Sequence, residues 1–159
     1  GCACNMAAYH EEMKQQEGSP EVKYAMRRLA RETLKRGNRA AMADATVVVT
    51  NPTHFAVALR YRPETDVAPL IVARGRGVVA EAIRELAAER QIPTLSYPSV
   101  ARGLYFTGKV GMLVRADLYA AVATILAFVL RVGQPDAEQP EAEAPDTAMF
   151  DEHGRPVVA

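Results

Sequence analysis

Cysteine is almost absent from this chain of 159 residues, and both copies, Cys2 and Cys4, fall within its first four residues. No second Cys pair or His pair accompanies them to complete the four ligands of a metal site, so no metal is expected. Residues 1–8 are expected to be a cloning remnant and the start of a linker. The absence of cysteine elsewhere excludes disulfide bonds in the folded part and favours a reducing compartment.

Tryptophan is absent as well, and aromatic residues make up only 6% of the chain. Binding of single-stranded nucleic acid depends on aromatic platforms and a basic groove. This chain has 19 Lys+Arg and 19 Asp+Glu, a formal net charge of zero, so nucleic acid is not an expected partner. Long apolar runs are also missing, since the stretch Leu118–Leu130 is interrupted by Thr124 and is shorter than the ~20 residues of a membrane span. If the protein works at a membrane, its anchor is expected in a segment absent from this chain.

The net charge of zero conceals two oppositely charged parts. Residues 134–159 hold seven acids and one base, a net charge of −6, which leaves +6 on the rest of the chain. Residues 133–159 are too polar to bury a core and are predicted to form an acidic disordered tail. Residues 9–43 are rich in Lys and Arg, and Ser19-Pro20 is typical of a helix start. They are predicted to form a basic N-terminal linker helix.

Hydrophobic patterning between these two parts predicts one α/β domain over residues 44–132. The run Thr46–Thr50 is β-branched throughout, which is typical of a central strand buried on both faces. Three predicted strands, at 45–50, 55–61 and 69–74, come first in the domain. A predicted helix at 75–90 (apolar stripe Val79, Ile83, Leu86 and Ala87), a strand at 92–95 and helices at 98–106 and 115–131 follow. The predicted fold class is therefore α/β (α+β), a small four-stranded mixed sheet wrapped by about four helices, with the long linker helix at its N-terminus.

A glycine pair resembles part of a nucleotide-binding motif. Gly75-Arg76-Gly77 follows a predicted strand and opens a predicted helix, as the phosphate-binding turn of a dinucleotide site does. Such a site also needs an acid near the end of the next strand, where this chain has Ser96 and Tyr97. A tight strand-to-helix turn is the simpler interpretation, and no cofactor is expected. A nucleotide-binding domain that uses these glycines stays as an alternative.

The turn Asn51-Pro52-Thr53-His54 carries the most unusual chemistry in the sequence. An Asn side-chain amide can attack its own main-chain carbonyl, close a succinimide ring and expel the nitrogen of the next residue. The competing deamidation needs a backbone N–H on that next residue, and proline has none. A strained turn would hold the amide near the carbonyl, while His54 could relay a proton and Thr53 could fix the turn. A plain β-turn is the alternative that these four residues alone leave open.

The segment Val47–Tyr61, which contains this turn, resembles the cleavage segment of the FlhB/YscU family of type III secretion switch proteins. Further segments agree with that family in the same order: Glu17–Lys23, Ala68–Ala73, Ile83–Ala87, Pro93–Leu95, Ala101–Tyr105 and Leu118–Ala123. The resemblance extends from about Tyr9 to Arg131. Because several ordered segments accompany the four-residue turn, the resemblance is specific.

The resemblance implies the cytoplasmic domain of a bacterial inner-membrane protein in a flagellar or injectisome export apparatus. Such a domain would cleave itself between Asn51 and Pro52 and help to switch export from early to later substrates. Its implied partners are other export-apparatus proteins, exported substrates and a length-control protein. The site residues would be Asn51, Pro52, Thr53 and His54, acting within one chain and without turnover of an external substrate. The second alternative is a non-cleaving α/β module for protein docking.

Overall fold

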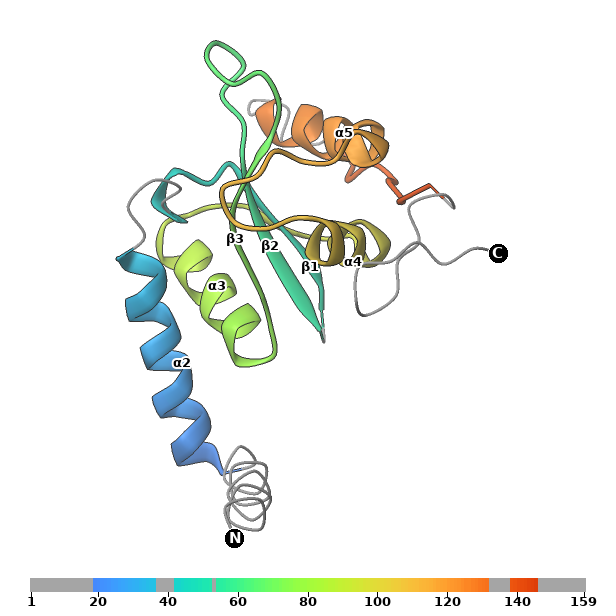
Figure 1. The fold of residues 1–159 in the computed structure, drawn as a ribbon. Helices are drawn as coiled ribbons and strands as arrows, with labels where there is room; N and C mark the ends of the chain where they lie inside the picture. The colour runs from blue at the N-terminus through green and yellow to red at the C-terminus, as the bar shows by residue number, and fades with distance from the viewer. Residues whose placement is uncertain (1–18, 37–41, 53, 132–137, 146–159) are drawn as a thin grey trace, which may run out of the picture.

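The structure, a computed structural model, describes residues 19–36, 42–52, 54–131 and 138–145. Cys2, Cys4 and the whole of residues 1–8 lie outside these ranges. Figure 1 shows a sheet with helices on both of its faces and one helix that extends away from it. The elements in chain order are α2 (Pro20–Lys35), η1 (Met42–Asp44), β1 (Val47–Asn51), β2 (Phe55–Arg60), β3 (Leu70–Arg76), α3 (Val78–Glu89), β4 (Thr94–Ser96), α4 (Pro98–Thr107), η2 (Ala116–Leu118) and α5 (Tyr119–Leu130).

The four strands form one mixed sheet in the order β3-β2-β1-β4. β1 pairs antiparallel with β2 and parallel with β4, and β2 pairs antiparallel with β3. The predicted fold class, a small four-stranded mixed sheet wrapped by helices, is confirmed. The β-branched run becomes an inner strand, as its composition predicts. The strand that follows Pro93 lies at an edge, where proline is tolerated.

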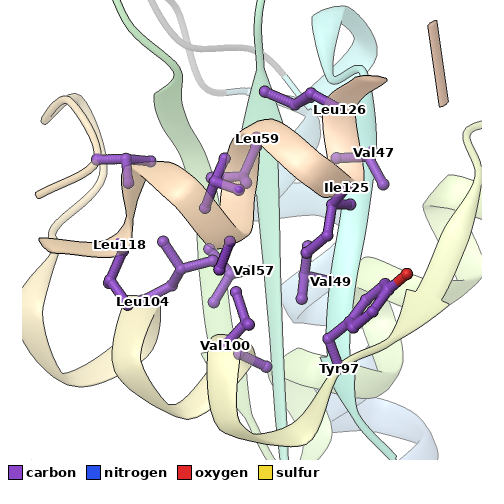
Figure 2. Packing of buried hydrophobic residues seen from close by; sticks show 14 of the residues in the cluster. Val47, Val49, Val57, Leu59, Tyr97, Val100, Leu104, Leu118, Ile125 and Leu126 are labelled. Carbon is purple, nitrogen blue, oxygen red and sulfur yellow. The ribbon is translucent and has the colours of Figure 1, made fainter. Parts of the chain in front are cut away.

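Two apolar layers cover the two faces of the sheet. Alternate residues of β1 serve opposite layers, because side chains in a strand point to opposite faces. Val47 and Val49 belong to the layer beneath α4 and α5, which Figure 2 shows, and Val48 belongs to the layer beneath α3. All three valines are fully buried. β1 is therefore held by side-chain packing on both faces as well as by hydrogen bonds at both edges.

The predicted apolar stripe of α3 is correct at three of its four positions. Ile83, Leu86 and Ala87 are buried, whereas Val79 is 37% exposed. Val79 instead lies over Gly75, where an added methyl group would come within 2.3 Å of Val79 Cγ1. Only glycine at this position of β3 lets the first turn of α3 approach the strand so closely.

The helix α2 contacts the domain through charged side chains and through Leu34, which packs partly buried against the layer beneath α3, and it contains no fully buried residue. Arg27 Nε lies 2.8 Å from Glu85 Oε1, and Arg31 forms ion pairs with Glu85 and Glu89 of α3. The predicted basic linker helix over 9–43 is thus a helix from Pro20 to Lys35, while residues 9–18 and 37–41 lie outside the described ranges. Ser19 occupies the position before the helix, as predicted, without a hydrogen bond from its side chain to the helix N-terminus.

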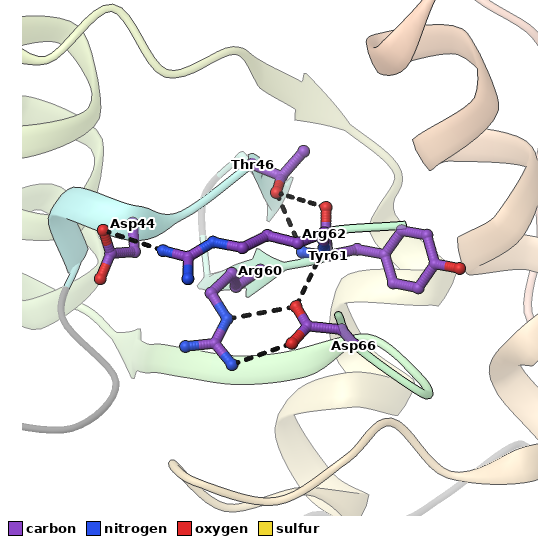
Figure 3. A network of polar contacts seen from close by, with 6 residues as sticks. All are labelled: Asp44, Thr46, Arg60, Tyr61, Arg62 and Asp66. Carbon is purple, nitrogen blue, oxygen red and sulfur yellow. Dashed lines mark hydrogen bonds and ion pairs between the residues drawn. The ribbon is translucent and has the colours of Figure 1, made fainter. Parts of the chain in front are cut away.

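A polar network closes the end of β2 that lies away from the predicted turn (Figure 3). Asp66 accepts hydrogen bonds from the Arg62 N–H at 2.9 Å and from the Arg60 guanidinium at 3.2 and 3.3 Å. These contacts, led by the Arg62 N–H, lower the pKa of Asp66 below its usual 3.8. The ionised carboxylate therefore fixes the loop that joins β2 to β3 at neutral pH.

Residues 138–145 contain no helix or strand, yet they lie against the domain. Ala142 and Ala144 pack on the layer beneath α4 and α5, and the Tyr97 hydroxyl donates a hydrogen bond to the Pro140 carbonyl. The small side chains of Ala142 and Ala144 allow the backbone of this segment to lie close to the domain. A prediction from composition does not take such packing into account. Of the predicted acidic disordered tail, residues 133–159, the structure describes only these eight residues.

Candidate functional site

The predicted turn joins the two inner strands of the sheet. Asn51 is the last residue of β1 and pairs with Phe55, the first residue of β2. The His54 N–H donates a hydrogen bond to the Asn51 carbonyl oxygen, with an N···O distance of 2.9 Å. Thr53 lies outside the described residues. Asn51 is half-buried, whereas Pro52 and His54 are exposed, so the turn projects from an otherwise buried pair of strands.

The residue before Asn51 is fixed by the neighbouring edge strand. Thr50 is 4% exposed, and its carbonyl accepts a hydrogen bond of 2.9 Å from the Tyr97 N–H. Its hydroxyl donates to the Leu95 carbonyl at 3.3 Å. These contacts, together with the Thr50–Ser96 register, leave little freedom to the chain that enters Asn51.

On the far side of the turn, Gly77 of the β3–α3 connection and Arg84 of α3 hold the loop. The Gly77 N–H donates to the His54 carbonyl at 3.3 Å, and Arg84 Nη1 donates to the Pro52 carbonyl at 2.6 Å. Sequence reasoning places Arg84 on the solvent face of its helix and gives no signal that it reaches a loop 32 residues earlier in the chain. Arg84 is thus one of the contacts at this site that sequence reasoning misses.

The start of β2 is anchored by aromatic packing. Phe55 is 6% exposed and stacks on Tyr105 of α4 with ring centroids 4.7 Å apart, while Phe106 meets it edge-on at 5.3 Å. The His54 and Phe55 ring centroids lie 5.9 Å apart. Packing and hydrogen bonds therefore hold the two strand ends on either side of the turn.

The two glycines of the nucleotide-binding alternative, Gly75 and Gly77, both have a structural role in the fold. Gly75 belongs to β3 and pairs with Ala56 of β2. Gly77 adopts a φ of 58°, which favours glycine, and turns the chain into α3. Because the Gly77 N–H bonds to His54, this amide is directed at the turn. The interpretation of these glycines as a tight strand-to-helix turn accounts for both of them.

In chemical terms the turn presents a main-chain carbonyl whose oxygen already accepts a hydrogen bond, next to a side-chain amide on the same residue. A backbone N–H aimed at a carbonyl oxygen stabilises negative charge that develops there during nucleophilic attack. Because proline follows Asn51, the usual deamidation route is closed. The arrangement suits attack on the carbonyl carbon of Asn51 from within its own residue.

Within the described residues, no helix is both long enough and apolar enough to cross a membrane. The model of the FlhB HrpN YscU SpaS family matches residues 6–129. The flagellar biosynthetic protein FlhB of Aquifex aeolicus is 47% identical over 120 residues, which are 76% of this chain and 34% of that relative. FlhB of Escherichia coli is 45% identical over 119 residues, or 75% of this chain and 31% of the relative. The chain thus spans about a third of the length of these curated relatives.

Solved structures share the fold. The cytoplasmic domain of FlhB from Shewanella putrefaciens superposes with a TM-score of 0.63 at 30% identity, over 78% of this chain and 95% of that one. A C-terminal domain of EscU with an Asn-to-Ala substitution superposes with a TM-score of 0.57 at 27% identity, over 64% of this chain and 97% of that one. The family match, the identities and the shared fold all cover the strands that carry the Asn51–His54 turn, and the chain belongs to the FlhB HrpN YscU SpaS family.

Proposed function

We propose that this domain cleaves its own chain between Asn51 and Pro52 by cyclisation of Asn51, and that it acts in a bacterial type III export apparatus. The observation that carries the proposal is the geometry of the Asn51 carbonyl, whose oxygen accepts a hydrogen bond of 2.9 Å from the His54 N–H. The hydrogen bond orients and polarises the carbonyl between two strands that cannot move apart. Effective molarities of well-oriented intramolecular reactions correspond to ~7–11 kcal/mol of the barrier.

The reaction proceeds in two steps. In the first, Asn51 Nδ2 attacks the Asn51 carbonyl carbon, the bond from that carbon to the Pro52 nitrogen breaks, and a proton passes from the amide to Pro52. The products are a C-terminal succinimide on Asn51 and a free secondary amine on Pro52. In the second step, water opens the imide and leaves a C-terminal carboxylate. We assign to the His54 imidazole, three residues after Asn51, the transfer of this proton from the attacking amide to the leaving nitrogen.

The solved relatives support the choice of this dipeptide. EscU C-terminal domains have been determined with an Asn replaced by Ala or Asp, and with the Pro that follows it replaced by Ala. The same pair of residue types stands at Asn51-Pro52, in the turn between the two inner strands. Cleavage there would create new chain ends on an exposed loop while the strands on either side stay paired. We propose that this local change alters which exported proteins dock on the domain.

The measurement that tests self-cleavage is the mass of the purified chain in denaturing solvent. Two species are expected, residues 1–51 and residues 52–159, formed without added protease. The yield should rise with incubation time and be independent of protein concentration, because the reaction is intramolecular. A single species with the mass of the whole chain after prolonged incubation at neutral pH would contradict the proposal.

Replacing His54 by Ala is expected to slow cleavage without stopping it. General acid–base assistance is typically worth ~10²–10⁴-fold in rate, and that range is the expected loss. The backbone N–H at position 54 is retained, so polarisation of the Asn51 carbonyl persists. Fragment yield followed by mass spectrometry gives the rate, and His153→Ala provides a histidine control. An unchanged half-life would remove the imidazole from the mechanism.

Replacing Pro52 by Ala is expected to suppress cleavage and to open the deamidation route. The alanine supplies the backbone N–H that proline lacks, and its nitrogen leaves as a primary amine. The mass of the intact chain should then rise by about 1 Da on incubation, since deamidation exchanges an amide for a carboxyl group. Rapid cleavage of this variant would show that the proline is not needed.

Replacing Arg84 by Ala is expected to slow cleavage about fivefold. A hydrogen bond from an exposed guanidinium contributes ~1 kcal/mol, which corresponds to about fivefold in rate. Arg84→Lys should retain part of the rate, because its ammonium group can still donate to the Pro52 carbonyl. Arg90→Ala, at the exposed end of the same helix, is the matched control. Equal rates for Arg84→Ala and Arg90→Ala would mean that the contact does not position the turn.

Protein docking without cleavage is the second candidate function, and one surface favours it. An apolar groove of about 310 Å³ lies between α5 and the loop before β3, and is lined by residues that include Val67, Tyr119 and Leu130. Val67 is 96% exposed. The proposed occupant is an apolar segment of an exported protein. A chain that stays whole in the mass measurement but binds such a segment would favour docking as the sole function.

We place the full-length protein at the cytoplasmic side of a bacterial inner membrane, among the other proteins of the export apparatus, its exported substrates and a length-control protein. The support for this is membership of the family and the similarity to the cytoplasmic domain of FlhB. Membrane fractionation of the native protein, with detection of both fragments, tests the location. Recovery of the full-length protein in the soluble fraction would contradict it.

A further inference from the structure

The segment of residues 138–145, called the strap below, lies on the domain with a two-residue period. Pro140, Ala142 and Ala144 are half-buried, whereas Glu141 and Glu143 between them are exposed. Alternation of this kind is the signature of an extended chain that turns one face to a surface and the other to water. The inward side chains are small and the outward ones are acidic.

Hydrogen bonds fix the strap at three points on β4 and α4. The Tyr97 hydroxyl donates to the Pro140 carbonyl at 2.5 Å, and the Ala144 N–H donates to Ser99 Oγ at 3.0 Å. The Gln139 side chain donates to the Ser96 carbonyl at 3.3 Å. Burial raises the pKa of Tyr97 above its usual 10.0, so its hydroxyl keeps the proton that it donates. Two of the three hydrogen bonds use backbone groups of the strap, the Pro140 carbonyl and the Ala144 N–H. Any extended peptide offers such groups, so another segment could form the same two bonds.

The surface beneath the strap is shaped for small side chains. Gly103 of α4 has no side chain, and the Ala144 Cβ lies 3.9 Å from the position that a Gly103 Cβ would occupy. Near the start of the strap, a cleft of about 320 Å³ continues the surface between Pro140 and Phe128. A larger inward residue at position 142 or 144 would push the strap away from α4. The surface therefore selects for small residues at alternate positions of an extended segment and places few demands on the other side chains.

We propose that this surface, formed by Ser96, Tyr97, Ser99 and Gly103, is a docking site for an extended segment of a partner protein with small residues at alternate positions, and that the strap occupies it as a competitor within the chain. Recognition through backbone hydrogen bonds and alternate side-chain positions is a recurring mode of peptide binding.

The tether determines how strongly the strap competes. The strap and the surface belong to one chain, so the competition is intramolecular, and linked binding elements reach effective concentrations in the millimolar range. A partner segment with the same pattern must exceed the strap in affinity or in local concentration before it displaces it. Partner segments of high affinity or high local concentration would then bind the surface, and partner segments of low affinity would not. This inference is independent of self-cleavage, since it uses no residue of the Asn51–His54 turn.

The test uses the full chain and a fluorescently labelled peptide with the sequence of residues 138–145. In one variant, Ala142→Gln with Ala144→Gln, the inward face of the strap becomes too large for the surface. The matched control, Glu141→Gln with Glu143→Gln, introduces the same side chain on the outward face. Fluorescence anisotropy at an ionic strength of about 0.15 M, where long-range charge effects are screened, measures peptide binding.

The peptide is expected to bind the inward variant at least tenfold more tightly than the parent chain or the outward control. Adding Tyr97→Phe and Ser99→Ala to the inward variant should abolish the gain, since both remove hydrogen-bonding groups and keep the fold. Amide exchange at position 144 should accelerate in the inward variant alone. Equal peptide affinity in parent and inward variant, absence of saturable binding to the inward variant, or unchanged amide exchange would each overturn the proposal.

Discussion

Replacing Asn51 by Ala is expected to leave the chain in one piece. Alanine has no amide nitrogen, so no group on residue 51 can attack the carbonyl and no succinimide can form. The turn itself should persist, because its hydrogen bond from the His54 N–H reaches the main-chain oxygen of residue 51. Mass spectrometry in denaturing solvent should give only the mass of the whole chain after an incubation in which the parent chain is fully cleaved.

Two controls separate lost chemistry from lost structure. The variant should keep the helix and strand content of the parent by circular dichroism and unfold within a few degrees of it, since Asn51 is half-buried and lies at the end of its strand. Asn51→Asp should cleave slowly at neutral pH, because a carboxylate is a poorer nucleophile here than the reaction requires. Fragments from Asn51→Ala in parental yield would exclude the succinimide route.

The order of strands and helices was predictable because each element has its own local signal. The β-branched run before Asn51 marks an inner strand, and Pro98 opens the helix α4 close to where the pattern predicts it. The exposure of Val79 was not predictable, since it depends on the absence of a side chain at Gly75 of the preceding strand. Helical periodicity alone places Val79 with the buried residues.

The site was predictable only in its chemistry. Asn51 and Pro52 stand out because the reacting groups belong to two adjacent residues. The hydrogen bond from the His54 N–H to the Asn51 carbonyl is also local, since it lies within the four residues Asn51–His54. The contacts of the turn with Arg84 and Gly77, and the contact of Thr50 with Tyr97, join residues far apart in sequence. No periodicity or local motif encodes such contacts, so the support of the turn becomes apparent only in the folded chain.

After cleavage, the two pieces are expected to stay together on a size-exclusion column in native buffer and to separate in denaturant. The first piece contributes β1 to the middle of the sheet, between β2 and β4 of the second piece. Val47, Val48 and Val49 are fully buried, and burial of each is worth ~1.5–3 kcal/mol. Without β1, the second piece would expose the inner edges of β2 and β4 and both apolar layers.

The charged contact between the pieces should contribute far less than the strand. Arg27 and Arg31 of α2 face Glu85 of α3 across the two pieces, and exposed ion pairs contribute ~0–1 kcal/mol each. Sodium chloride at about 1 M, which screens such pairs, should therefore leave the pieces in one peak, as should Arg27→Ala with Arg31→Ala. If the two pieces separated in salt, the ion pairs of α2 would be what holds them together. If they gave two peaks in native buffer without added salt, cleavage would act by releasing a fragment. A single peak in every native condition would mean that cleavage acts through a local change around the new chain ends at Asn51 and Pro52, with both pieces still in place.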